Sequence, residues 1–367
     1  MKKIFQVLFL SLLCYACGSS EKQQLPKDYI EIDMVPLIEG KAKETFLQEW
    51  SKNVRFVPLD TNADVSFKLI QNVFQRGDTL LVHHFHRLSV FDINGKYLYD
   101  IGSESSIPTE NTKASFVCLH DDLIYALDHP NMKVYNWQGK FIKNITMPSN
   151  VWDVFPFPGK EEMLAYVANQ SGEEPVRFYR MKGEEVLDTV FNPFIYKRPE
   201  NVQEKFFGRN EFRCSAGSLK TFIETGSNTV YRVDEHLQTQ PYIVFNMGKH
   251  LYTRKRRYSE THEEWVKRIS EGNEWNLRVT GEINGRIYIY NDRKLSMIRE
   301  VLYVGDTYCY DKATKETSKY FLTYGENDWG ISPDEFFEPR SLVEDKFLVD
   351  WESSGHGNHA VLVLVEP

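Results

Sequence analysis

A repeat with a spacing of 44 residues constrains the fold of this chain more than any other feature. The stretch "VFDINGKYLYDI" at 90–101 matches "VYNWQGKFIKNI" at 134–145 in most columns, with Gly95 above Gly139. A further 44 residues along, Gly183 occupies the same column in "FYRMKGEEVLDTV". A glycine at this place supplies the positive φ angle that a tight hairpin turn needs. Each repeat is therefore predicted to contain a β-hairpin.

A short apolar strand precedes each of these hairpins, and similar strands continue towards the end of the chain. The six strands are 80–82, 123–127, 163–167, 221–225, 286–290 and 346–349. A small antiparallel sheet has two apolar faces, and both are buried when such sheets stack radially. The sequence therefore predicts an all-β fold, a six-bladed β-propeller. Segment 54–59 can pair with 360–365 and so close the ring by joining the two ends of the chain.

One helix interrupts the strands at 259–273, between the fourth and fifth expected blades. Thr261 and Glu264 have the spacing of a capping box at the start of a helix. Trp265 and Ile269 are four residues apart and would share one helix face. We therefore expect one short inserted helix in the propeller.

The first residues predict export. Residues 1–16 combine a short basic start, an apolar run from Ile4 to Leu13 and small residues near Ala16, which is typical of a secretory signal. The sequence "LLCYACGSS" resembles a bacterial lipoprotein signal, and lipidation would then fall on Cys17; ordinary signal cleavage is the alternative. The expected parts are a signal peptide at 1–16, a lipidated cysteine with a flexible tether at 17–45, and the propeller at 46–367.

The charge of the chain excludes nucleic acid as an expected partner. The formal net charge is −8, and removal of residues 1–16, which hold Lys2 and Lys3 and no acidic residue, changes it to −10. The remaining cysteines have no metal-ligand spacing and are expected to be isolated thiols rather than disulfide partners: Cys118, Cys214 and Cys309.

The motif "LSVFDINGKYLYDIG" at 88–102 resembles the NHL type of propeller repeat. Together with the lipoprotein signal, "VRFVPLDT" and "NDWGISPDEFFEPRSLVEDKFLV", it resembles the six-bladed β-propeller lipoproteins of gut Bacteroidetes over about residues 45–367. The resemblance implies the fold and a lipid-anchored place in the cell envelope, at the outer membrane and facing the periplasm or the exterior. It implies no catalytic residues. One departure is "GSESSIPTEN" after the first hairpin, where such proteins often have "G-x-G-P-G-E".

Polar residues at the ends of the apolar strands are the candidate ligand-binding residues. His84 lies 44 residues before Asp128, so it occupies a position at which other units carry Asp or Asn. A short polar side chain there can hydrogen-bond its own turn, and in a propeller such turns also surround one mouth of the central channel. His84 and His86 would share a strand face and could bind a metal only with ligands from another blade. The candidates at the channel rim are His84, His86, Asp128, Asn169, Asn291, Asp350, Trp152 and Trp351.

Other motifs do not predict catalysis. "HEEWV" at 262–266 lacks the second histidine of a zinc protease motif, and the chain has neither a nucleophile elbow nor a phosphate loop. The carboxylate pairs Asp121–Asp122 and Glu161–Glu162 fall at hairpin tips, where charge is normally solvated. No metal and no cofactor is therefore expected, and no catalytic residue can be assigned.

Three functions remain open from the sequence. The first is a membrane-anchored envelope lipoprotein whose propeller binds a glycan, a peptide or a partner protein at one face of the channel. The second is a propeller enzyme, of the lyase or lactonase type, with a metal or an acid and base in the channel. The third is a scaffold that works through protein contacts alone. A propeller can serve each of these functions, so the fold does not choose among them.

Overall fold

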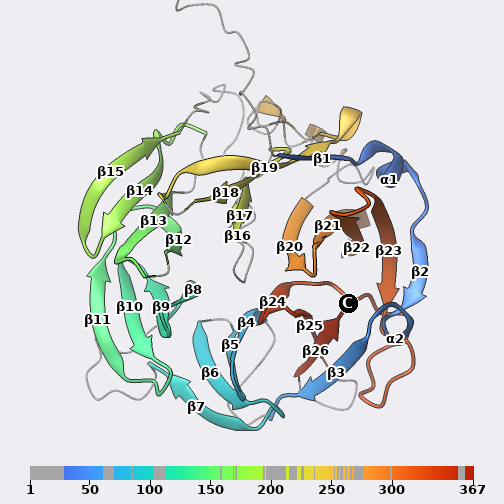
Figure 1. Cartoon of the computed structure of the whole chain (residues 1–367), viewed down its shortest axis with the longest axis horizontal. Helices are drawn as coiled ribbons and strands as arrows, with labels where there is room; N and C mark the ends of the chain where they lie inside the picture. The colour runs from blue at the N-terminus through green and yellow to red at the C-terminus, as the bar shows by residue number, and fades with distance from the viewer. Residues whose placement is uncertain are drawn as a thin grey trace, which may run out of the picture.

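Six β-sheets surround a central axis like the blades of a propeller (Figure 1). The predicted all-β six-bladed β-propeller is confirmed in this computed structural model. The structure describes residues 29–60, 70–102 except 85, 113–192 except 158, 168, 170 and 171, residue 195, 212–214, 221–251 except 225, 226 and 235, single positions between 253 and 267, 277–353 except 298 and 299, and 360–367.

Each blade has four antiparallel strands, which are named in order from the centre of the ring outwards. Blades 1 to 3 consist of β4 (Ile70–Arg76), β5 (Thr79–His84), β6 (Arg87–Asp92) and β7 (Tyr97–Ile101); β8 (Phe116–His120), β9 (Leu123–Asp128), β10 (Asn131–Asn136) and β11 (Phe141–Thr146); and β12 (Val151–Pro156), β13 (Glu162–Val167), β14 (Val176–Lys182) and β15 (Glu185–Phe191). Blades 4 to 6 consist of β16 (Phe212–Cys214), β17 (Thr221–Glu224), β18 (Thr229–Val233) and β19 (Thr239–Asn246); β20 (Leu277–Ile283), β21 (Arg286–Met297), β22 (Glu300–Asp311) and β23 (Thr317–Thr323); and β24 (Ser341–Val343), β25 (Phe347–Ser353), β26 (Ala360–Glu366) and β3 (Asn53–Pro58).

The six apolar strands found in the sequence are the second strands of the six blades, β5, β9, β13, β17, β21 and β25. Their apolar residues are buried because each strand has a sheet neighbour on both sides and a blade against each face. The buried apolar side chains of the described residues form six clusters, and each cluster lies between two neighbouring blades. Radial stacking thus buries both faces of every sheet, as the repeat predicts.

The predicted closure of the ring is confirmed. Strand β3 pairs antiparallel with β26, from Pro58 opposite Val361 to Asn53 opposite Glu366. Gly95 supports this joint, because its φ is +87° and a Cβ at this position would lie 2.0 Å from the carbonyl oxygen of Pro58. The turn glycine therefore provides both the turn conformation and the close approach of blade 1 to β3.

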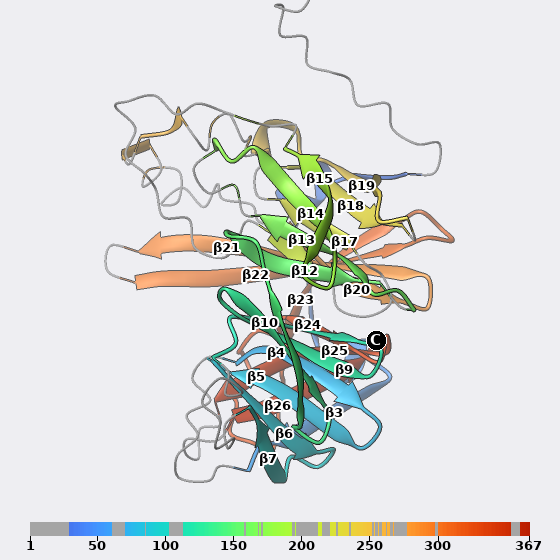
Figure 2. The ribbon, with the colours of Figure 1, turned by 90° about the vertical axis from the view of Figure 1, so that its left-hand side faces the viewer.

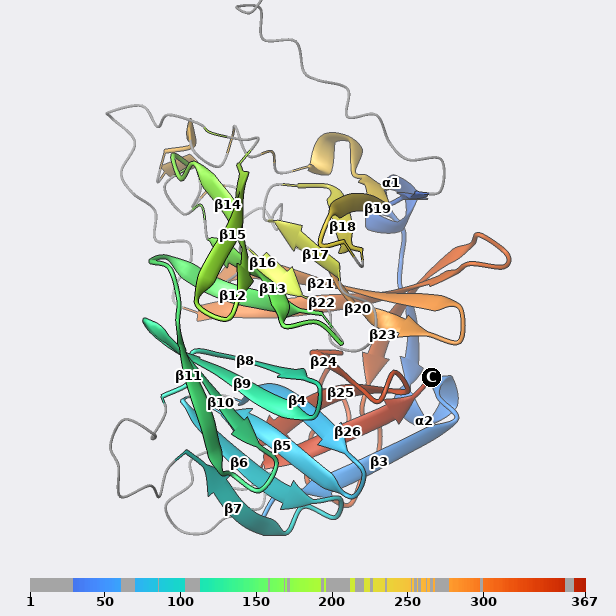
Figure 3. The ribbon, with the colours of Figure 1, turned by 60° about the vertical axis from the view of Figure 1, so that its left-hand side comes forward.

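The N-terminal segment adds two outer strands that the sequence does not predict. β1 (Ile30–Asp33) pairs parallel with β19, and β2 (Lys43–Phe46) pairs parallel with β23. The short helices α1 (Val35–Glu39) and α2 (Leu47–Trp50) follow them, and this segment runs along the outside of the ring (Figure 3). β1 and most of β2 fall in the segment expected to be a tether, and they pair with the free outer edges of blades 4 and 5. Residues 1–28, with the signal peptide and Cys17, lie outside the described residues.

Two insertions stand apart from the blades. Strands β21 and β22 continue well beyond their neighbours, from Asn291 opposite Asp306 to Met297 opposite Glu300 (Figure 2). The capping box of the expected helix is present, because the Thr261 amide donates to Glu264 Oε2 at 2.7 Å and the Glu264 amide donates to Thr261 Oγ1 at 3.2 Å. Trp265 and Ile269 lie outside the described residues. Within the part of the chain that the structure describes, no helix is long and apolar enough to cross a membrane.

Candidate functional site

The expected rim residues all lie towards one face of the ring. We call the face on which the second strand of each blade ends the upper face, and the opposite face the lower face. His84 and Asp128 are the last residues of β5 and β9, and Asn169 follows the end of β13. The first strand of a blade runs antiparallel to the second, so Trp152, at the start of β12, lies on the upper face as well.

Asn291 and Asp350 differ from the expectation that they follow a strand and sit in a turn. β21 continues to Met297 and β25 to Ser353, because the next strand in each sheet extends the pairing. Both residues are fully buried, with an exposed fraction of 0%. They are therefore components of the core near the upper face and cannot meet a ligand directly in this arrangement.

His84 lies in a buried chain of hydrogen bonds within blade 1. Its Nε2 is 2.8 Å from Ser89 Oγ, and Ser89 Oγ donates to Asp100 Oδ1 at 2.6 Å. Burial lowers the pKa of His84 to about 4, so the ring is neutral at pH 7. Because the hydroxyl proton points to the carboxylate, His84 donates through Nε2 and cannot activate Ser89 as a nucleophile. The chain of bonds joins three strands of one blade.

His83 and His86 meet at one backbone oxygen of the next blade. His83 Nε2 lies 3.1 Å, and His86 Nδ1 3.2 Å, from the carbonyl oxygen of Ala114. The expectation that His84 and His86 share a strand face is wrong, because β5 ends at His84 and β6 begins at Arg87. Among the described residues, no three His, Cys, Asp or Glu side chains are grouped so that they could hold a metal ion.

Three other expected rim residues stay separate from one another. Asp128 pairs with Lys133 Nζ at 2.9 Å, and Asn169 Oδ1 accepts the Glu174 amide at 3.0 Å. Trp152 is 37% exposed and is the one aromatic candidate with a large accessible face. Asn169 thus holds the loop that follows it, whereas Asp128 contacts the Lys133 side chain and the amide of Lys113 rather than its own turn.

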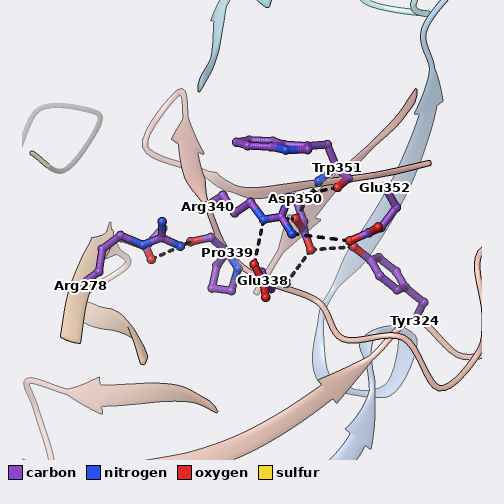
Figure 4. A network of polar contacts seen from close by, with 9 residues as sticks. Arg278, Tyr324, Glu338, Pro339, Arg340, Asp350, Trp351 and Glu352 are labelled. Carbon is purple, nitrogen blue, oxygen red and sulfur yellow. Dashed lines mark hydrogen bonds and ion pairs between the residues drawn. The ribbon is translucent and has the colours of Figure 1, made fainter. Parts of the chain in front are cut away.

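The structure brings Asp350 and Trp351 together with residues that sequence reasoning missed (Figure 4). Arg340 precedes β24, and its Nε lies 2.9 Å from Glu338 Oε2 and 3.1 Å from Asp350 Oδ1. Arg340 Nη2 lies 3.7 Å from Glu352 Oε1, and the guanidinium stacks 5.2 Å from the Trp351 ring centroid. We call Glu338, Arg340, Asp350 and Glu352 the acidic cluster. One guanidinium therefore faces three carboxylates.

The members of the acidic cluster differ in their access to water. Asp350 is inaccessible, whereas the side chains of Glu338, Arg340 and Glu352 are 20%, 28% and 24% exposed. Asp350 accepts hydrogen bonds from the Tyr324 hydroxyl at 2.7 Å and from the Glu338 amide at 2.6 Å, so its oxygens are satisfied from inside the protein. The two glutamates are left as the carboxylates that a ligand can reach.

The cluster also shifts the protonation of its carboxyl groups. Burial raises the pKa of Asp350 to about 6, and burial together with the Asp350 charge raises the pKa of Glu352 to about 8. Glu352 therefore carries a proton at pH 7, because a single guanidinium does not compensate three carboxylates in a partly dry site. Chemically, the cluster can accept a cation or donate a proton.

Blade 4 contributes a further residue that the sequence analysis missed. Glu224 ends β17 at the position of His84 and Asp128, and it forms a two-fold ion pair with Arg177 at 3.2 and 2.8 Å. The Arg177 guanidinium lies 4.8 Å from the Tyr231 ring centroid. This pair joins blades 3 and 4. An alignment of "TFIE" with "LIYALD" by strand ends would have found Glu224.

The chain belongs to the family described as domain of unknown function DUF4934, whose model matches residues 30–355. No curated protein matches it. Among solved structures, it is similar to a "Putative exported protein" from Bacteroides fragilis, at 14% identity and a TM-score of 0.61, over 92% of this chain and 99% of that one. It is also similar to virginiamycin B lyase from Staphylococcus aureus, at 8% identity and a TM-score of 0.42, over 85% and 99% of the two chains. The likeness to the Bacteroides fragilis protein shows a shared fold.

Proposed function

We propose that this chain is a lipoprotein of the bacterial cell envelope, anchored through Cys17, whose propeller binds a basic group of a peptide or partner protein at the upper face. The export signal in residues 1–16 supports the location, and the name of the Bacteroides fragilis protein agrees with it. The anchor would hold the protein at the outer membrane, facing either the periplasm or the exterior. The protein is then a binding protein and not an enzyme.

The observation that carries the proposal is the excess of carboxylates around Arg340. Glu338 and Glu352 are both partly exposed, and Arg340 alone cannot neutralise them together with Asp350. A lysine or arginine side chain of a ligand would add the missing positive charge in a partly dry site, where charge pairs are stronger than in water. The net charge, −8 for the full chain and −10 without residues 1–16, favours the approach of a basic partner as well.

The test is calorimetry with the full-length protein in detergent. The probes are a capped Gly-Gly-Arg-Gly-Gly peptide, the same peptide with Gln in place of Arg, and a neutral oligosaccharide. We expect only the arginine peptide to bind, and a Glu338→Gln and Glu352→Gln double variant to bind it at least about tenfold more weakly. A double variant with the same kind of substitution at two exposed glutamates outside the cluster, Glu316→Gln and Glu344→Gln, should bind like the wild type. Equal binding of the Gln peptide, or full affinity in the cluster variant, would show that the cluster is not the site.

A second candidate function, acid catalysis, is favoured by the proton that Glu352 holds at pH 7. A protonated carboxyl next to a guanidinium can donate to a leaving group. The alternative of a lactonase-like enzyme then predicts turnover of a simple lactone such as dihydrocoumarin, and its loss in Glu352→Gln. Absence of turnover in the wild-type protein would leave binding as the function of the cluster.

A further inference from the structure

A cavity on the lower face is separate from the acidic cluster. It has a volume of about 610 Å³ and lies between blades 2 and 3, among the turns that join their first and second strands. Cavities of this size commonly hold small ligands or single residues of a partner. Asp121, Glu161 and Glu162, which fall at separate hairpin tips in the sequence, line the same cavity. The structure therefore gives these carboxylates a shared location.

The floor of the cavity is apolar. Tyr125 and Ile145 of blade 2 and Met163 of blade 3 line it, and their exposed fractions are only 6%, 2% and 3%. These side chains belong to the cluster that packs the two blades together, so the floor is part of the core between blades 2 and 3. An apolar side chain of a ligand would bury further surface on this floor, at roughly 25 cal/mol per Å².

Two of the carboxylates in the cavity are already engaged within the protein. Asp121 accepts the Gly159 amide at 3.3 Å and lies 3.3 Å from His120 Nε2. Glu162 is held by two nitrogens of Arg180, at 2.9 and 2.7 Å. Arg180 neutralises Glu162, and the Gly159 amide and His120 hold Asp121 in place, so both carboxylates already have partners within the protein.

Lysines stand on both walls of the cavity. Lys143 lies on β11 of blade 2 and has no ion-pair partner among the described residues. Lys182 of blade 3 lies 3.8 Å from Glu161, and the two side chains are 53% and 79% exposed, so this pair is weak and exchangeable. An anionic group between the two walls would therefore contact two ammonium groups, and only the weak pair of Lys182 with Glu161 would have to be broken. Glu161 and Glu185 remain as acceptors beside them.

We propose that this cavity binds the C-terminal residue of a peptide whose last side chain is apolar. The side chain packs on Ile145 and Met163, and the α-carboxylate lies between Lys143 and Lys182. The peptide N–H groups donate to Glu161 or Glu185, which a fatty acid could not do. This site is independent of the function proposed for the acidic cluster.

The test is calorimetry of the full-length protein with acetyl-Gly-Gly-Leu. The free acid is expected to bind, and its C-terminal amide to bind at least about tenfold more weakly. Lys143→Gln with Lys182→Gln should reduce the affinity for the acid by a similar factor. The matched control is Lys96→Gln with Lys140→Gln, two exposed lysines that do not line the cavity, and it should bind like the wild type.

Three results would overturn this proposal. The first is equal binding of the free acid and the amide, and the second is absence of binding by the wild-type protein. The third is binding of decanoate without binding of the peptide, because that result would assign the cavity to lipid chains. Glu338→Gln with Glu352→Gln should leave acetyl-Gly-Gly-Leu binding unchanged, so a failure at the upper face can be told apart from a failure in this cavity. Equal thermal midpoints of the lysine variants show that each one is folded.

Discussion

The stability of the acidic cluster should depend on pH through Glu352. Its pKa rises from 4.5 to about 8 because burial removes water from the carboxyl and Asp350 adds negative charge nearby. In the unfolded chain the carboxyl has its ordinary pKa, so between these two values the native state keeps a proton that the unfolded state has released. The free energy of unfolding therefore falls as pH rises through this window, and the full cost is present above about pH 8.

The size of this effect follows from the same shift. Each pKa unit is worth about 1.4 kcal/mol, so the whole rise would cost about 5 kcal/mol at high pH. The Glu352 side chain is 24% exposed, and water at its open side reduces the cost to about 2 kcal/mol. Glu352→Gln keeps the shape of the side chain and removes its titration. The variant should therefore be more stable than the wild type by about 2 kcal/mol at pH 9, and by less than about 0.5 kcal/mol at pH 4.

Urea unfolding followed by tryptophan fluorescence measures this difference at both pH values. The control is Glu316→Gln, an exposed carboxylate in the turn between β22 and β23 on the lower face, which should change stability by less than about 0.5 kcal/mol at either pH. A gain of the same size at pH 4 and pH 9 would show that the effect does not arise from the titration of Glu352. A loss of stability at pH 9 would show that the Glu352 charge is favourable.

Three other substitutions test separate parts of the account. Cys17→Ser should move the protein from the membrane to the soluble fraction, and unchanged partitioning would exclude the lipid anchor. Arg340→Met leaves buried carboxylates without their counter-charge and should lower the free energy of unfolding in urea by about 3–5 kcal/mol. Arg76→Met, in an exposed ion pair, should lower it by less than about 1 kcal/mol. Similar losses in the two variants would contradict a stabilising role of Arg340 in the cluster. Gly95→Ala should lower the thermal midpoint more than Gly183→Ala, because a Cβ would lie 2.0 Å from a backbone oxygen of β3 at the first position and would meet nothing within 4 Å at the second.

The ring could be predicted from the sequence because its repeats carry local information. The turn glycines Gly95, Gly139 and Gly183 all have positive φ, and the apolar strands beside them alternate with turns in every blade. The closing pair could be predicted for a related reason, since two apolar strands at the chain ends lacked partners. Local pattern and tertiary fold agree at these places.

The outer strands β1 and β2 could not be predicted. Their sequences, IEID and KETF, are only four residues long, and each pairs with the outer edge of a blade. Tertiary pairing therefore decides their conformation. The same argument explains why the sequence of segment 17–45 resembles a tether although it contains β1 and most of β2.

Only part of the acidic cluster and its surroundings could be predicted from the sequence. Asp350 and Trp351 lie on a repeated strand and could be placed, whereas Tyr324, Glu338 and Arg340 come from the connection before β24, where the repeat gives no register. Strand alternation also led to the wrong prediction that His84 and His86 share a strand face, because β5 ends at His84 and His86 lies in the turn before β6. Residues outside the repeat need three-dimensional information before they can be assigned to a site.

Proton release on binding is the most direct test of a cation site at the acidic cluster, because it links a basic ligand to Glu352. Calorimetry of the capped arginine peptide at pH 7, in two buffers with different ionisation enthalpies, counts the protons released. We expect net release from the wild-type protein, since a cation beside Glu352 lowers its pKa from about 8, and a clear reduction of this release in Glu352→Gln. Binding without proton release, or equal release from wild type and variant, would contradict a cation site at the acidic cluster.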